Sequence, residues 1–95
     1  MSWTVQCPSQ TADTLEGAAR ANYETFRGKY NDHEGAMVGM DEQFEAALAA
    51  ATVILASGAV GTSAAVVTMS GHANPGHVKR DGWSNDSIVV SIAQH

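Results

Sequence analysis

The sequence predicts an α+β domain of two layers, in which two antiparallel helices pack on one face of a three-stranded sheet in the order β-α-α-β-β. Three segments, at residues 2–7, 64–70 and 87–93, alternate polar and apolar residues, and this period of two is typical of half-buried strands. Between the first and the second of them, apolar residues recur every three or four positions in two stretches, which indicates amphipathic helices. Because 95 residues leave room for one core, we expect residues 1–95 to form a single domain.

The N-terminal segment predicts a strand followed closely by a helix. The strand is expected over Ser2–Cys7 and should end at Pro8. Its inward residues would be Trp3, Val5 and Cys7. The helix should begin within residues 10–14, where side-chain oxygens can accept free amide hydrogens and Glu16 follows Asp13 at capping-box spacing. Its apolar stripe would be Leu15, Ala19, Tyr23, Phe26 and Tyr30.

A loop and a second helix are predicted next. The stretch from Asn31 to Gly39 holds two glycines and shows no apolar period, so we expect it to be a loop that reverses the chain. The second helix is predicted from about Asp41 to Ala56, with acidic residues in its first turn, where the helix dipole favours them. Gly58 is its expected C-cap. Its inward stripe would be Phe44, Leu48, Ala51 and Leu55, flanked by Ala47 and Ile54.

The two remaining strands are predicted over Ala64–Ser70 and Ser87–Ala93. Their core-facing residues would be Ala65, Val67 and Met69 in the first, and Ile88, Val90 and Ile92 in the second. Because an antiparallel helix pair separates the first two strands, the second should run opposite to the first and the third parallel to it. A short sheet leaves exposed strand edges, which favours a homodimer. A monomeric mass at tens of micromolar would count against that hypothesis.

The charge balance argues against nucleic acid as a partner. Five Lys and Arg residues against ten Asp and Glu residues give a formal net charge of -5, whereas binding to phosphate groups depends on basic side chains. Eight of the ten acids precede residue 58 and therefore fall mainly on the predicted helices. We take this acidic helical face as the second candidate for a contact surface.

The single cysteine and the lack of long apolar runs indicate a reducing compartment. Cys7 cannot form an internal disulfide, and the N-terminus lacks the basic region and apolar run of a secretory signal. The longest apolar stretch, near Ala46–Ala56, is shorter than the roughly 20 residues that span a bilayer. We therefore expect a cytoplasmic protein with no membrane partner, in which Cys7 is an inert core residue.

The segment between the last two predicted strands is the first candidate for a contact surface. It runs over sixteen residues from Gly71 to Asp86, where two to five would close a hairpin. Trp83 offers an aromatic anchor, and Lys79 with Arg80 offers a charged rim, as protein interfaces use them. The candidate contact residues are His72, Asn74, His77, Lys79, Arg80, Trp83 and Asp86.

Two other interpretations of this segment stay open. In the first, His72, His77 and Asp81 bind a divalent metal or another small ligand, although a spacing of five between the histidines fits no standard metal motif. In the second, the histidines bond to the loop backbone and Trp83 only closes the end of the core. Ser, His and Asp occur here without a GxSxG elbow, so we expect neither an enzyme nor a bound cofactor.

The segments Ser70-Gly71-His72-Ala73-Asn74-Pro75 and Gly82-Trp83-Ser84-Asn85-Asp86, followed by an alternating strand, resemble small proteins of tailed bacteriophages that infect actinobacteria. The similarity runs from about Met69 to Ile92, roughly a quarter of the chain. It implies an accessory protein made in the cytoplasm of an infected host, in a class where some members bind or inhibit host proteins. We therefore expect a host protein as the partner; the resemblance supplies no catalytic residue.

Overall fold

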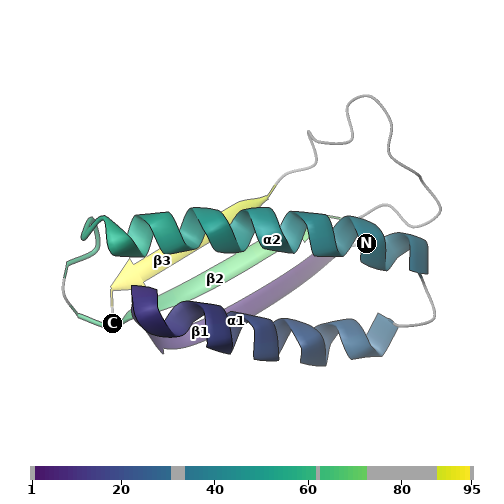
Figure 1. Ribbon diagram of the computed structural model, residues 1–95, viewed down its shortest axis with the longest axis horizontal. Helices are drawn as coiled ribbons and strands as arrows, with labels where there is room; N and C mark the ends of the chain where they lie inside the picture. Colours follow the sequence, from purple (N-terminus) through teal and green to yellow (C-terminus); the bar gives the residue numbers. More distant parts are fainter. Residues whose placement is uncertain (1, 31–33, 62, 73–87, 95) are drawn as a thin grey trace.

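The computed structural model describes residues 2–30, 34–61, 63–72 and 88–94, and it has the α+β architecture that the sequence predicts. Two helices lie side by side and antiparallel in front of a three-stranded sheet (Figure 1). The elements in chain order are β1 (Ser2–Gln10), α1 (Ala12–Arg27), the 3-10 turn η1 (Gly28–Tyr30), α2 (Glu34–Ala56), β2 (Ala65–His72) and β3 (Val89–Gln94). Helix α1 packs mainly on β1, and α2 packs on β2 and touches β3.

The strand order across the sheet is β1-β2-β3, so β2 is the central strand. Each neighbouring pair is antiparallel, which makes β3 parallel to β1 and confirms the predicted directions. The register pairs Val5 with Met69 and Met69 with Val90, so these three residues cross the sheet on one row. Opposite residues of antiparallel strands share a face, and this row therefore points to the helices.

Strand β1 is longer than predicted, because Pro8 does not end it. The register shifts between Cys7 and Gln10, where a bulge gives Ser9 a φ of 61° and lets pairing resume at Gln10. A proline has no N–H to donate, which would break a ladder bond in a central strand. Strand β1 is an edge strand, so Pro8 is tolerated there.

Helix α1 begins at Ala12, within the predicted window, but its cap differs from the expected one. The Thr14 hydroxyl accepts a hydrogen bond of 2.9 Å from the Thr11 backbone N–H. Thr11 is the N-cap, and the spacing of Asp13 and Glu16 therefore lies inside the helix rather than at its cap. The capping residue is set by where the strand releases the chain, which the composition of residues 10–14 does not fix.

Helix α2 begins at Glu34, so the loop predicted from Asn31 to Gly39 is wrong for residues 34–39. Glycine inside a helix costs about 1 kcal/mol relative to alanine, and the sequence pattern therefore disfavoured this turn. Burial of Gly39 and Met40 against the core outweighs that cost. At the other end Gly58 has a φ of 78° and terminates the helix as predicted.

The core lies between the sheet and the two helices, and the predicted inward faces of the strands are confirmed. The buried apolar residues are Trp3, Val5, Cys7, Leu15, Ala19, Tyr23, Met40, Phe44, Ala47, Leu48, Ala51, Ala65, Val67 and Met69. Phe26, Leu55, Val90 and Ile92 pack against them and are partly buried. The exception on the strands is Ile88, which was predicted to face the core but precedes β3 and is 38% exposed. Ile54, which flanks the predicted stripe of α2, is 37% exposed.

Candidate functional site

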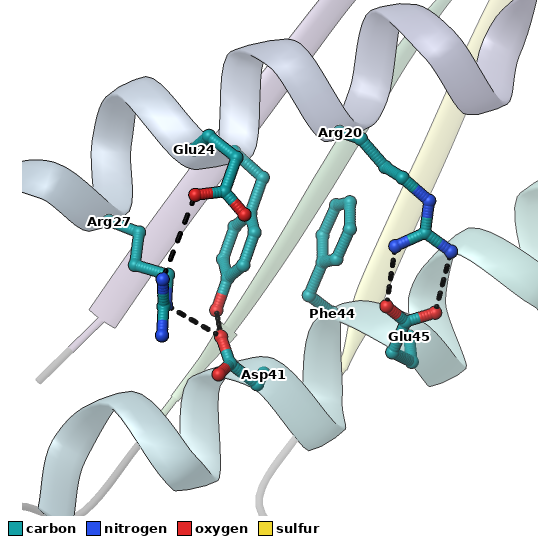
Figure 2. A pocket seen from close by; sticks show the side chains of 7 residues that line it. Arg20, Glu24, Arg27, Asp41, Phe44 and Glu45 are labelled. Atoms are coloured by element: carbon teal, nitrogen blue, oxygen red, sulfur yellow. Dashed lines mark hydrogen bonds and ion pairs between the residues drawn. The ribbon is translucent and has the colours of Figure 1, made fainter. Parts of the chain in front are cut away.

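A polar groove lies between the two helices and forms an open pocket of about 240 Å³. Figure 2 shows how its charged side chains reach toward one another from α1 and α2, with the Phe44 ring between two sets of contacts. The lining residues are Arg20, Tyr23, Glu24, Arg27, Asp41, Phe44 and Glu45. The groove is a candidate functional site, because charged side chains of α1 and α2 face each other across it.

On one side of Phe44, Arg20 of α1 and Glu45 of α2 form a two-pronged ion pair (Figure 2). The Arg20 Nη1 and Nη2 atoms lie 2.7 and 3.1 Å from the two Glu45 carboxylate oxygens, and Arg20 Nε lies 3.2 Å from Glu16. The hydrogen bond from Arg20 lowers the pKa of Glu45, and the hydrogen bond to Glu45 raises the pKa of Arg20. Both side chains are about half exposed, so solvent screening keeps the contribution to stability small.

On the other side of Phe44, Tyr23 and Arg27 of α1 both meet Asp41 of α2. The Tyr23 hydroxyl donates a hydrogen bond of 2.5 Å to Asp41 Oδ1. Arg27 Nε lies 3.2 Å from the same oxygen, close enough for an ion pair although the N–H does not aim at it as in a hydrogen bond. Burial first, and then the hydrogen bond to the Asp41 carboxylate, raises the pKa of Tyr23 far above its ordinary value.

These contacts make the groove a clamp between the helices. Among its lining residues, each guanidinium is paired with a carboxylate from the facing helix. Tyr23 is held neutral, and its ring stacks on Phe44 with a centroid distance of 4.1 Å and an angle of 2°. A group that acts as base or nucleophile needs a pKa near the working pH, and the raised pKa of Tyr23 moves it the other way.

The clamp predicts how Tyr23 titrates. In a Tyr30→Phe variant Tyr23 is the only tyrosine. The folded state favours its protonated form, so the stabilisation is complete below the ordinary pKa near 10 and is lost as the pH rises above it. We expect the ultraviolet absorbance of tyrosinate to appear only together with unfolding, as circular dichroism would record. Tyrosinate formed near pH 10 in a chain that stays folded would contradict the clamp.

Removing the hydroxyl measures the same contact by stability. Tyr23→Phe should lower the free energy of unfolding by about 1–2 kcal/mol, toward the low end for a hydrogen bond to a charged group, because Asp41 remains partly solvated and keeps Arg27. Thr25→Ala is a matched control, since the Thr25 hydroxyl bonds only within α1 at an exposed position. Urea unfolding of both variants gives the comparison.

The lone thiol is outside the groove and is buried on β1. Cys7 is fully buried in the core, and Asn22 Nδ2 lies 3.6 Å from its sulfur. Burial raises the pKa of the Cys7 thiol, which keeps it protonated and unreactive. This agrees with the expectation that Cys7 is a core residue.

A second feature lies at the end of the β2–β3 hairpin, where Gly71 is buried against Trp3. A side chain at Gly71 would place its Cβ 2.6 and 2.7 Å from two carbons of the Trp3 indole and would also meet the buried Gln43. Trp3 in turn packs edge-on against Tyr23 and Phe44, at centroid distances of 6.0 and 6.2 Å. The hairpin end is therefore held firmly on the core.

The predicted contact residues start at this hairpin end. His72 is the last residue of β2, and its main chain pairs with Ser2. Its side chain lies outside the described residues, as do the other candidates, Asn74, His77, Lys79, Arg80, Asp81, Trp83 and Asp86. Pairing of Ser70 with Val89 brings both ends of the segment that carries these candidates to the same end of the sheet.

Two general properties can be stated for the described part of the chain. Within it, no group of three or more His, Cys, Asp or Glu residues is placed to hold a metal ion. Of the helices that are described, none is long and apolar enough to cross a membrane.

The sequence does not predict the clamp, because its ion pairs join residues far apart in the chain, and the acids were assigned only to a candidate contact surface. Arg20 and Glu45 are 25 residues apart, and Tyr23 and Asp41 are 18 apart. One signal in the sequence could have indicated these contacts. Where two helices run antiparallel, residue numbers rise along one helix as they fall along the other, so a contact of residue 20 with residue 45 is consistent with a contact of residue 23 with residue 41. This alignment of the two helices can be used only when the residues at which the helices start are known.

The chain matches no protein-family model, no curated protein and no solved structure.

Proposed function

We propose that this protein is a binding module rather than an enzyme, and that it contacts another protein through residues His72 to Asp86. The observation that supports this most is the pairing of Ser70 with Val89, which ties both ends of that segment to one hairpin. Trp3 and Gly71 fix the hairpin end on the core. Segments carried by a rigid scaffold are where proteins concentrate their binding residues.

The chemistry of the segment suits a protein surface. Trp83 is the type of large side chain that dominates binding energy, and Lys79 and Arg80 are the only two basic residues after residue 58. A partner with an acidic rim around an apolar hollow would match them. In the setting implied by the phage resemblance, the partner is a protein of the bacterial host, met in the host cytoplasm.

The groove between the helices supports the non-enzymatic part of the proposal. Its arginines are held by carboxylates, and its tyrosine is kept protonated, so the lining residues offer a substrate no free charge and no activated nucleophile. The groove contributes a stiff scaffold instead.

The test is capture from an actinobacterial lysate with the tagged full chain. We expect one host protein in stoichiometric amount, retained by the wild type and by Lys29→Ala, a control at an exposed position. The variant His72→Ala/Lys79→Ala/Trp83→Ala, checked for folding by circular dichroism, should lose it. Retention by that variant together with loss in Asp13→Asn/Glu42→Gln would move the site to the acidic helices and contradict the assigned segment.

A melting-temperature experiment with added metal separates the metal-binding interpretation from the protein-binding proposal. If zinc or nickel raises the melting temperature of the wild type and His72→Ala abolishes the shift, the segment binds a metal, and the protein-binding proposal loses its ground. No shift with either metal, alongside specific capture, supports the proposal.

A further inference from the structure

The outer edge of β3 has no paired strand among the described residues. Strand β3 pairs with β2 along Val89–Gln94 and is the last strand of the sheet. Its ladder is regular, and the strand contains no proline and no charged residue. A flat, uncharged edge strand is a template on which another strand can add.

The other edge of the sheet is protected against such pairing. In β1, Pro8 offers no N–H, and the bulge at Ser9 shifts the register. Asn22 of α1 donates a hydrogen bond of 3.0 Å to the Gln6 carbonyl, so a helix side chain already occupies part of the β1 backbone. The two edges therefore differ, and β3 lacks each of the devices that protect β1.

Between Ala46 and Ile54, the side of α2 that faces away from α1 is also uncharged, and the exposed Glu42 lies one turn before this stretch. Asp41, Glu45 and Thr52 line the side toward α1. Ala46, Ala50 and Ile54 follow one another at spacings of four, on the opposite side, and all three are exposed. This places a slim apolar helix face above an open strand edge. Half-buried Val90 and Ile92 lie beneath the helices on that strand.

We propose that β3 pairs antiparallel with β3 of a second copy of this chain, about a two-fold axis at Ser91. Directly opposed residues of antiparallel strands share a face. With the axis at Ser91, Val90 meets Ile92 of the second copy on the helix side, and Val89 meets Ala93 of the second copy on the outer side. The sheets join into one of six strands, and the alanine faces of the two α2 helices approach each other.

A second copy of this chain is the favoured partner, because the edge of β3 is complementary to itself. Each apolar position on β3 meets another apolar position on both faces of the sheet, which is what an isologous interface requires. Each chain carries a formal charge of -5, so two copies repel unless their acids stay apart. Pairing through β3 does this, because the charged groove faces α1 rather than the interface.

The test compares two single lysine substitutions at exposed positions of the outer sheet face, one on each edge strand. Ser91→Lys sets two like charges opposite each other at the axis, and Thr4→Lys sets the same charge on β1. In sedimentation equilibrium from micromolar to hundreds of micromolar, we expect the wild type and Thr4→Lys to be dimers. Ser91→Lys should raise the dissociation constant severalfold, up to about fivefold.

A cysteine pair gives a positive signal that does not depend on weakening the protein. Ser91→Cys should form an intermolecular disulfide under mild oxidation, because its Cβ atoms oppose each other at the axis, whereas Thr4→Cys should not. Buried Cys7 can be left in place. A monomeric wild type, a dimer that Ser91→Lys leaves intact, or cross-linking by Thr4→Cys alone would each overturn the proposal, whatever the lysate capture shows.

Discussion

Replacing Trp3 by alanine is expected to lower the free energy of unfolding by about 3–5 kcal/mol, the largest effect of any single truncation among the described residues. Trp3 is the largest fully buried side chain, with 1% of its surface exposed. Its ring touches both members of the stacked pair Tyr23 and Phe44, so its removal leaves a cavity that two helices and a strand cannot all close. Small domains are stable by about 5–15 kcal/mol, and this loss therefore leaves little.

The measurement is urea unfolding followed by far-ultraviolet circular dichroism. Trp3→Phe is the matched variant, and it should cost less than alanine for two reasons. It keeps an aromatic ring against Tyr23, and it removes the indole Nε1, which is buried without a hydrogen-bond partner among the described residues. An alanine variant with an unchanged unfolding midpoint would show that Trp3 does not hold the core together.

Adding one methyl group at Gly71 is expected to lower the free energy of unfolding by about 1–3 kcal/mol, as overpacking of a filled core does. The new Cβ would lie 2.6 Å from the Trp3 indole, closer than unbonded carbon atoms approach, and it would also strike the Gln43 side chain. Because Trp3 is fixed by its own neighbours, the strand has to move instead. The hairpin end would shift, and with it the proposed contact segment.

Gly17→Ala is the control for this substitution. Gly17 lies in α1, where an added Cβ meets nothing within 4 Å, so alanine should raise stability by about 0.5–1 kcal/mol through helix propensity. A double variant Gly71→Ala/Trp3→Phe should lose less than the sum of the two single losses, because the clash involves atoms of the indole. If the two losses in free energy of unfolding add exactly, the effect of Gly71→Ala does not arise from a clash with the Trp3 indole.

The strand faces could be predicted because burial on one side leaves a period of two. The inward residues Trp3, Val5 and Cys7 of β1, and Val67 and Met69 of β2, are apolar, and their neighbours are polar except Pro8 and Val66. The α2 stripe from Phe44 to Ala51 was equally clear. These patterns are local, so a single sequence is enough to read them.

What the sequence could not fix depends on contacts between distant residues. Helix α2 starts before Asp41 despite glycines at positions 35 and 39, and the burial of Met40 in the core favours this earlier start. Pro8 continues β1 only because that strand lies at an edge, and the strand order that makes it an edge has no local signature. The candidate contact residues beyond His72 lie outside the described residues, so their role stays a prediction.

The clamp shows the same limit for side chains. Arg20 has a partner at i−4, Glu16, which the sequence shows, and a second partner, Glu45, which it does not. The acidic helical face is consequently less available to a partner than its net charge suggests. Part of it is committed to holding α1 against α2.

The open edge of β3, and not the groove between the helices, is the surface through which we propose that two copies of this domain pair. Amide hydrogen exchange of the full chain at micromolar and at hundreds of micromolar concentration tests it most directly. We predict that alternate amides of Val89–Gln94, those directed away from β2, become protected as the concentration rises, while the α1–α2 amides do not change. Exchange in β3 that is the same at both concentrations, or a change confined to the helices, would contradict it.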